Sequence, residues 1–120
     1  MAQTTKKDFK LFKKECRKWL NFFGLKQWTV HLFHRECEEG WAEFYPDVSG
    51  RTVTIVLNTD FTDYDKVPKR MIRQVAFHEI VEGVLLAELR DMLFDRGYTR
   101  LEIDKRIHPI VRTLENSVFE

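Results

Sequence analysis

A histidine and two glutamates interrupt the apolar stretch "VAFHEIVEG", which runs from Val75 to Gly83. His78 and Glu82 are four residues apart, so on a helix they lie one turn apart and can bind the same ion. Glu79 follows His78 directly and can reach a water molecule on that ion. This is the H-E-x-x-H spacing of zinc sites, with glutamate in place of the second histidine. The alternative is structural: His78 and Glu82 form a buried hydrogen-bonded pair, and Glu79 lies in solvent.

A third ligand is needed for a catalytic zinc site, and His108 is the leading candidate. It lies four residues after Asp104, three before Val111 and seven before Glu115, at the edge of the inward face of a predicted helix. The alternative for His108 is a packing or capping role. Pro109 follows it directly and can turn its side chain away from the site.

Two further histidines compete for the third position. His31 and His34 lie on a predicted strand, where they point to opposite faces, so at most one of them reaches the site. Three tyrosines, Tyr45, Tyr64 and Tyr98, can donate a hydrogen bond to a developing oxyanion, and the sequence does not distinguish among them.

The set of His78, Glu82 and His108 contains two histidines and one carboxylate, as do the zinc sites of thermolysin-type peptidases. Three protein ligands leave the fourth position of Zn²⁺ to a water molecule, whose pKa falls to about 7 on the metal. Glu79 is then the general base that takes the water proton and passes it to the leaving amine. The predicted cofactor is therefore Zn²⁺.

Hydrophobic periodicity and turn residues indicate the elements that position these side chains. An amphipathic helix is expected over residues 5–23, strands over 27–36, 40–45 and 51–58, a helix from 68 to about 89 or 93, and a last helix that starts at the Thr99 and Glu102 capping box. Pro109 predicts a kink or a broken turn in the last helix. Gly83 costs about 1 kcal/mol inside a helix, so a close packing contact is expected there. The fold class is α+β: an N-terminal helix, a three-stranded mostly antiparallel sheet, a central helix with the motif, and a C-terminal helix.

Length and composition favour a single folded domain over residues 1–120. The chain is 43% hydrophobic and 32% charged, and no Gly, Ser or Pro-rich linker divides it. No apolar run is long enough to span a bilayer and no secretory signal is visible, so a cytoplasmic protein without a membrane partner is expected. Cys16 and Cys37 agree with a reducing compartment, because they lack the spacing of a metal site and are expected to be separate thiols.

Charge is distributed unevenly. Residues 1–27 contain eight basic and two acidic residues, which gives a net charge of +6 there against +1 for the whole chain. A basic first helix can bind nucleic acid or an acidic partner. A solvated face opposite a core stripe is the simpler interpretation.

Four stretches resemble a family of small phage and prophage proteins classed as zincin-like metallopeptidases. They are "FKKECRKWLNFFGLKQWTVHL", "VTIVLN", "VAFHEIVEGVLL" and "IDKRIHPIVRTLEN". The resemblance implies a helix packed on a small three-stranded sheet, as in minimal zincins and the distantly similar SprT-like proteins. It also implies a phage-encoded, zinc-dependent hydrolase of peptides or proteins that acts in the host cytoplasm. By position it assigns His78, Glu82 and His108 as ligands and Glu79 as the base.

This chain departs from the family pattern at Glu82, where histidine is commoner. The substitution lowers the charge of the site and can weaken its Lewis acidity or metal affinity. The alternative function is a non-catalytic phage protein that binds a host factor or nucleic acid through the basic first helix. In that case the H-E-x-x-E residues are structural.

Overall fold

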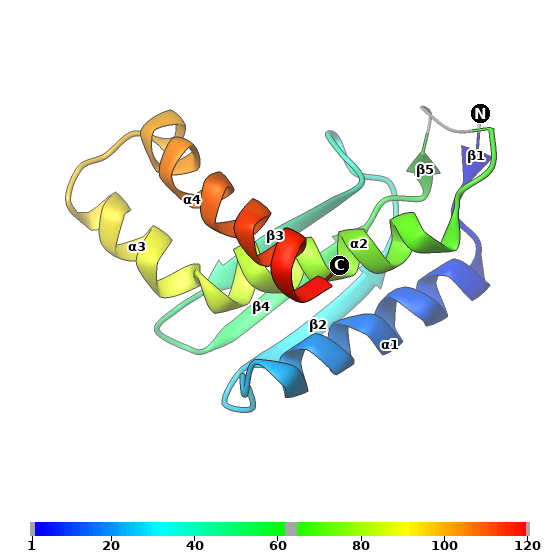
Figure 1. The fold of residues 1–120 in the computed structure, drawn as a ribbon, viewed down its shortest axis with the longest axis horizontal. Helices are drawn as coiled ribbons and strands as arrows, with labels where there is room; N and C mark the ends of the chain where they lie inside the picture. Colours follow the sequence, from blue (N-terminus) through cyan, green and yellow to red (C-terminus); the bar gives the residue numbers. More distant parts are fainter. Residues whose placement is uncertain (1, 62–64, 120) are drawn as a thin grey trace.

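The structure is a computed structural model that describes residues 2–61 and 65–119. Figure 1 shows its elements along the chain. They are β1 (Ala2–Gln3), α1 (Lys6–Phe22), β2 (Thr29–His34), β3 (Ala42–Asp47), β4 (Thr52–Leu57), β5 (Asp60–Phe61), α2 (Lys69–Ile80), the π-helical η1 (Val81–Leu85), α3 (Ala87–Asp95), α4 (Arg100–Leu114) and the π-helical η2 (Glu115–Phe119). The predicted α+β class is confirmed. None of the helices in the described ranges combines the length and apolar character needed to cross a membrane.

The main sheet has three strands in the order β2-β4-β3. A short turn joins β3 to β4, so these strands pair antiparallel, with Phe44 opposite Ile55. The preceding connection carries the chain from β2 to the far edge of the sheet, and β4 then returns between them. As a result β2 and β4 pair in parallel, with Leu32 opposite Ile55. A mostly antiparallel sheet was predicted, and only the β3–β4 pair of these three strands is antiparallel. A second sheet, β1 with β5, was not predicted.

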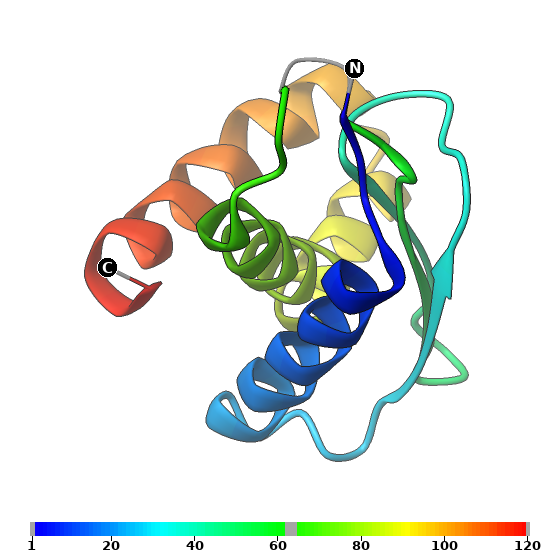
Figure 2. The same cartoon turned by 90° about the vertical axis from the view of Figure 1, so that its right-hand side faces the viewer.

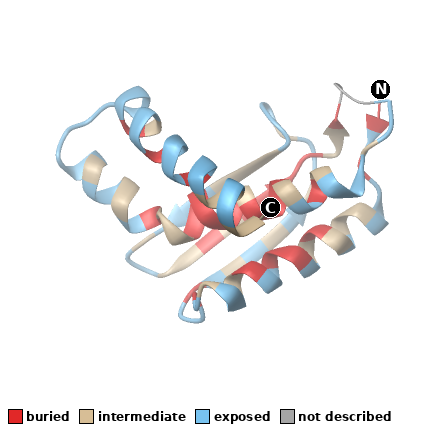
Figure 3. Cartoon of the chain, viewed as in Figure 1, coloured by how far each residue is buried: buried red, intermediate tan, exposed pale blue. Residues whose placement is uncertain are grey.

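Helices α1 and α2 cover the same face of the sheet, and α4 lies beyond α2 (Figures 1 and 2). Alternate residues of β4, Val53, Ile55 and Leu57, are fully or almost fully buried. The two helices meet at Trp19 and Phe77, whose ring centroids are 4.7 Å apart in an edge-to-face arrangement. Figure 3 shows buried residues along the inner side of α1, and the buried residues of α2 gather in its second half. The helix that carries the motif therefore lies at the centre of the core.

The motif helix is interrupted where a continuous α-helix was predicted. After Ile80 the chain widens into η1, and the Leu86 N–H donates to the Val81 carbonyl at 2.9 Å, a spacing of five residues. Leu86 has φ −98° and ψ 11°, and α3 starts after it. π-helical turns are uncommon and often occur at functional sites. Glu82 lies within this turn.

The last helix is more regular than expected. The Thr99 side chain accepts a hydrogen bond from Glu102 N–H and the Glu102 side chain accepts one from Thr99 N–H, which confirms the capping box. Helix α4 continues through Pro109 to Leu114, so the broken turn predicted at Pro109 is not found. His108 consequently keeps a helical position.

Gly83 makes the predicted close contact. A Cβ atom at this position would lie 2.8 Å from Cγ of Phe44 on β3, closer than two carbons can approach. The neighbouring Cβ of Phe44 lies 3.1 Å away, so rotation of the ring cannot relieve the overlap. Glycine is therefore required for the helix to approach the sheet this closely.

Gly83→Ala is accordingly expected to destabilise the protein by about 1–3 kcal/mol, because overpacking outweighs the gain of up to about 1 kcal/mol in helix propensity. Chemical denaturation measures the change. The matched control is the same substitution in a Phe44→Ala background, which removes Cγ and the ring, so the cost should shrink or reverse there. An equal cost in both backgrounds would contradict the assigned contact.

Candidate metal centre

The fold brings the predicted ligands together from three helical elements. His78 lies near the end of α2, Glu82 in η1 and His108 on α4. His108 Nε2 lies 2.9 Å from Glu82 Oε1, and His78 Nε2 lies 3.5 Å from the same oxygen. The structure therefore places both imidazoles around one carboxylate oxygen, across a separation of 30 residues between the two histidines.

Glu82 Oε1 is buried and accepts no hydrogen bond of good geometry, although both nitrogens are close to it. Glu82 as a residue is 7% exposed. A buried carboxylate oxygen without a hydrogen bond is costly unless it binds a cation. The two imidazoles therefore surround Glu82 Oε1 without an aligned N–H, and either a protonated histidine or a shared cation would stabilise this oxygen.

The spacing around Glu82 Oε1 is compatible with zinc. Ligand atoms about 2.0–2.1 Å from a tetrahedral Zn²⁺ are about 3.3 Å from one another. The observed 2.9 and 3.5 Å fall on either side of this value. Within the described ranges no three His, Cys, Asp or Glu side chains are already arranged to enclose a metal ion. The donor types fit zinc, and the two rings, whose centroids are 6.4 Å apart, have to move to close the site.

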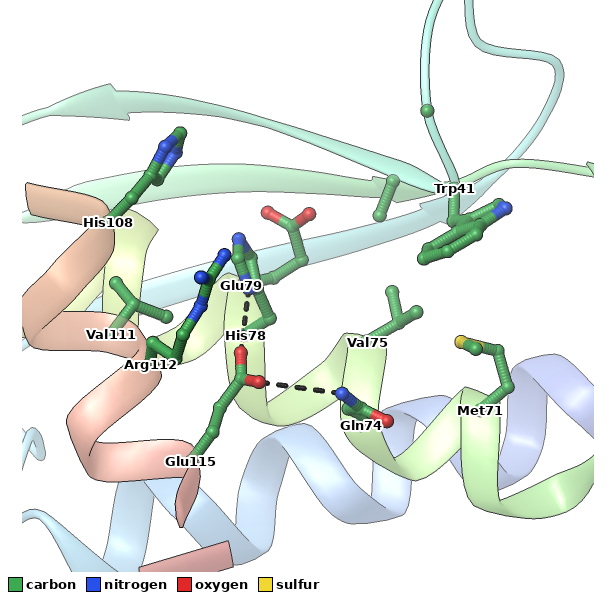
Figure 4. A pocket seen from close by; sticks show the side chains of 12 residues that line it. Trp41, Met71, Gln74, Val75, His78, Glu79, His108, Val111, Arg112 and Glu115 are labelled. Atoms are coloured by element: carbon green, nitrogen blue, oxygen red, sulfur yellow. Dashed lines mark hydrogen bonds and ion pairs between the residues drawn. The ribbon is translucent and has the colours of Figure 1, made fainter. Parts of the chain in front are cut away.

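Glu115 fixes the orientation of His78. Its Oε1 lies 2.9 Å from His78 Nδ1, and its Oε2 accepts a hydrogen bond from the Gln74 amide at 3.4 Å (Figure 4). A carboxylate on one ring nitrogen holds the proton there and leaves the other nitrogen free to bind a metal. His78 therefore presents Nε2 to the side where Glu82 and His108 lie.

Arg90 supports the other oxygen of the glutamate ligand. Its Nη2 lies 3.8 Å from Glu82 Oε2, and its Nη1 lies 3.0 Å from Asp104 Oδ1 on α4. The Arg90 side chain is largely buried and lies over the Phe44 ring, 5.9 Å from its centroid. This chain of contacts ties α3 to α4 and keeps Glu82 Oε1 on the side of the histidines.

The ionisation of the histidine and glutamate ligands is coupled. Burial raises the pKa of Glu82, but its contacts with His78 and the charges of His108 and Arg90 outweigh burial and lower the pKa below its ordinary value. Burial lowers the pKa of His78, and its contacts with Glu82 and Glu115 outweigh this and raise the pKa to about 9. Without a metal the site is therefore an ion cluster, with Glu82 ionised and His78 protonated at neutral pH.

Glu79 is buried rather than solvated, which argues against the purely structural interpretation of the motif. It is 6% exposed, and its Oε2 has no hydrogen-bond partner. Burial raises the pKa of Glu79 to about 8, with His78 acting in the opposite direction and Glu82 adding to the increase. An unpaired buried carboxyl group with a pKa near neutrality is typical of a general acid or base.

The imidazoles and Glu79 open into a pocket of about 450 Å³ between α2, α4 and the start of β3. Figure 4 shows His78 and Glu79 from α2 and His108 from α4 at one end of it, with Trp41 and Met71 at the other. The full lining is Gly40, Trp41, Ala42, Met71, Gln74, Val75, His78, Glu79, His108, Val111, Arg112 and Glu115. The polar end carries the candidate chemistry, and the apolar end offers a surface for a side chain of a ligand.

The competing histidines lie elsewhere. His34 Nε2 is 2.7 Å from Thr4 Oγ1, and its ring stacks on Phe9. His31 is exposed and alternates with His34 along β2, as predicted. Neither lines the pocket.

The tyrosines offer little support for an oxyanion role. Tyr45 is exposed and bonded to Glu43, and Tyr98 is exposed between α3 and α4. Tyr64 lies outside the described residues.

Sequence reasoning missed the supporting residues of the site. Glu115 and Asp104 were already visible on the same helical stripe as His108, so their spacing carried a usable signal. The position of Arg90 gave no such signal, because the direction of its side chain depends on where η1 ends at Leu86. Trp41 belongs to the loop before β3, and no local pattern relates it to the motif helix.

No protein-family model, curated protein or solved structure matches this chain. A function therefore has to be supported by the geometry of the site.

Proposed function

We propose that this protein is a zinc-dependent metallopeptidase. One observation carries the proposal: the imidazoles of His78 and His108 both lie close to Glu82 Oε1, beside the buried carboxyl group of Glu79. Two imidazoles and a carboxylate are the ligand set of one class of catalytic zinc site, and they leave a position open for chemistry. His78, Glu79 and His108 line a pocket large enough for part of a peptide, and Glu82 lies buried behind the two imidazoles.

The ligands would be Nε2 of His78, Nε2 of His108 and the Glu82 carboxylate. When bound, zinc supplies an acidified water molecule and polarises the carbonyl of the substrate. Glu115 holds the Nδ1 proton of His78, so Nε2 remains a neutral donor. Arg90 and Asp104 hold the second oxygen of Glu82 away from the open side.

Glu79 moves the proton. As a carboxylate it removes a proton from the attacking water and then delivers it to the nitrogen of the leaving amine. Burial keeps its pKa close enough to neutrality for both transfers, and a nearby dication would favour the ionised form that starts the reaction. The apolar walls from Trp41, Met71 and Val75 exclude water around a bound side chain.

Zinc titration of the metal-free protein and hydrolysis assays on unfolded casein and a mixed peptide library test this function. We expect one zinc per chain and cleavage that a chelator abolishes and added zinc restores. Failure to bind zinc would exclude the proposed metal centre. Stoichiometric zinc without cleavage of either substrate would favour a structural metal over a peptidase.

A further inference from the structure

The outer side of α1 carries a row of four exposed cations that the proposed peptidase site does not use. Lys7, Lys10, Lys14 and Arg17 follow one another at intervals of three, four and three residues and are all exposed. At about 100° per residue they occupy an arc of roughly 80° on the helix. We call these four residues the basic row.

The carboxylates of α1 do not neutralise the basic row. Asp8 accepts a hydrogen bond from Thr5 N–H in the N-terminal capping box, and Glu15 is buried on the inner side of the helix. The ion pair on α1 joins Glu15 to Lys18 at 3.9 Å. Among the residues that the structure describes, no member of the row forms an ion pair with a carboxylate.

The surface beside the row is hollowed. A shallow groove of about 540 Å³ is lined by Lys7, Lys10, Leu11, Lys13, Lys14 and Arg17. Lys13 is partly engaged within the molecule, since its Nζ lies 4.8 Å from the centroid of the Phe9 ring. Five cations around one groove repel each other, and an anion in the groove would relieve that repulsion.

The groove is remote from the candidate metal centre, because α2 lies between α1 and α4 in both views (Figures 1 and 2). The apolar side of α1, with Phe12, Cys16 and Trp19, is buried against the core (Figure 3). Helix α1 therefore cannot insert its apolar side into a bilayer, and a lipid surface would be bound through charge alone.

We propose that the basic row binds the phosphodiester backbone of a nucleic acid without reading its sequence. The row spans about 15 Å at 1.5 Å per residue, a length that covers several successive phosphates of one strand. Protein–protein interfaces usually depend on a few exposed aromatic residues, and the basic row contains none. The exposed Phe22 lies at the end of α1, off the row. The basic row would therefore bind its partner mainly by charge, and a nucleic acid is a polyanion with regularly spaced charges.

Fluorescence anisotropy with a labelled 20-base-pair DNA duplex tests this inference in wild type and in the triple variant Lys7→Gln, Lys10→Gln, Lys14→Gln. Four phosphate contacts predict a slope of about −3.6 in log K against log salt, so affinity should fall roughly 150-fold between about 50 and about 200 mM salt. The triple variant should bind more than tenfold more weakly at low salt, with a slope near about −0.9. A matched single-stranded oligonucleotide should give a shallower slope for wild type, about −0.7 per contact.

The control variant Arg100→Gln, Lys105→Gln, Arg106→Gln removes the same charge from exposed positions on α4 and should bind like wild type. Equal thermal melting of the variants verifies that the fold is kept. Absence of duplex binding by wild type would overturn the proposal, as would equal weakening in both triple variants. Binding to phosphatidylserine vesicles or to an acidic protein such as polyglutamate-rich prothymosin, with no binding to DNA, would also overturn it. None of these outcomes depends on zinc or on peptide hydrolysis.

Discussion

Glu79→Gln is expected to lower peptide hydrolysis by between about 100-fold and about 10,000-fold, the usual contribution of a general base. Glutamine has nearly the same shape, so the pocket is kept, but its amide cannot take a proton from water. Zinc affinity should stay within a few-fold of wild type, because Glu79 is not among the three ligands. The measurements are kcat/KM on a cleaved peptide and zinc per chain by mass spectrometry.

The exposed Glu36 provides a matched control, and Glu36→Gln should leave both quantities unchanged. A Glu79→Gln protein that retains zinc and full turnover would remove Glu79 from the mechanism. A variant that loses both would instead show that Glu79 holds the metal centre together.

The pH dependence of stability separates a catalytic defect from unfolding. Burial raises the pKa of Glu79 from its ordinary 4.5 to about 8, so the folded metal-free protein binds a proton that the unfolded chain has released. The stability of wild type is therefore expected to decrease as pH rises from 4.5 to 8, through this group, and Glu79→Gln lacks that loss. At pH 7 the variant should be the more stable protein, by roughly 3 kcal/mol at most.

Local patterns predicted the elements that position the site. The α1 stripe and the capping box at Thr99 each depend on residues close in sequence, and both are confirmed. Strand β4 is also found where it was predicted, although Val56, expected on the opposite face from Ile55, is buried as well. The parallel pairing of β2 with β4 was not predictable in this way, because it depends on how the connection crosses the sheet. The β1–β5 pair is too short to give a periodic signal.

In the candidate site, too, the features that depend on local spacing were predicted and those that depend on packing were not. Spacing of four identified His78 and Glu82, and a helical stripe identified His108, so the sequence predicted which residues meet. It did not predict the π-helical turn at Glu82, which has no fixed residue signature and contains Gly83, the residue that approaches Phe44 closely. The contact of the Glu115 carboxylate with His78 was also missed, because it depends on the packing of η2 against α2.

His108→Ala is expected to weaken zinc binding by more than about 100-fold, because each ligand of a zinc site contributes about 3 kcal/mol of the roughly 10–16 kcal/mol of binding free energy. The His108 side chain is 50% exposed, so its removal leaves little cavity and the fold should persist. Glu82→Ala should lose zinc to the same extent but also destabilise the metal-free protein, since it leaves His78 and Arg90 without their shared carboxylate.

Glu115→Gln distinguishes a ligand from its support. The glutamine oxygen can still accept a hydrogen bond from His78 Nδ1–H but carries no charge, so zinc affinity should fall by about 10-fold to 100-fold, less than for either ligand. His31→Ala is the control, because His31 is exposed on β2 and away from the pocket. Competition with a chelator measures all four variants. Equal zinc affinity in His108→Ala and His31→Ala would exclude His108 as the third ligand, whereas the graded order would support His108 and Glu82 as ligands and Glu115 as the support of His78.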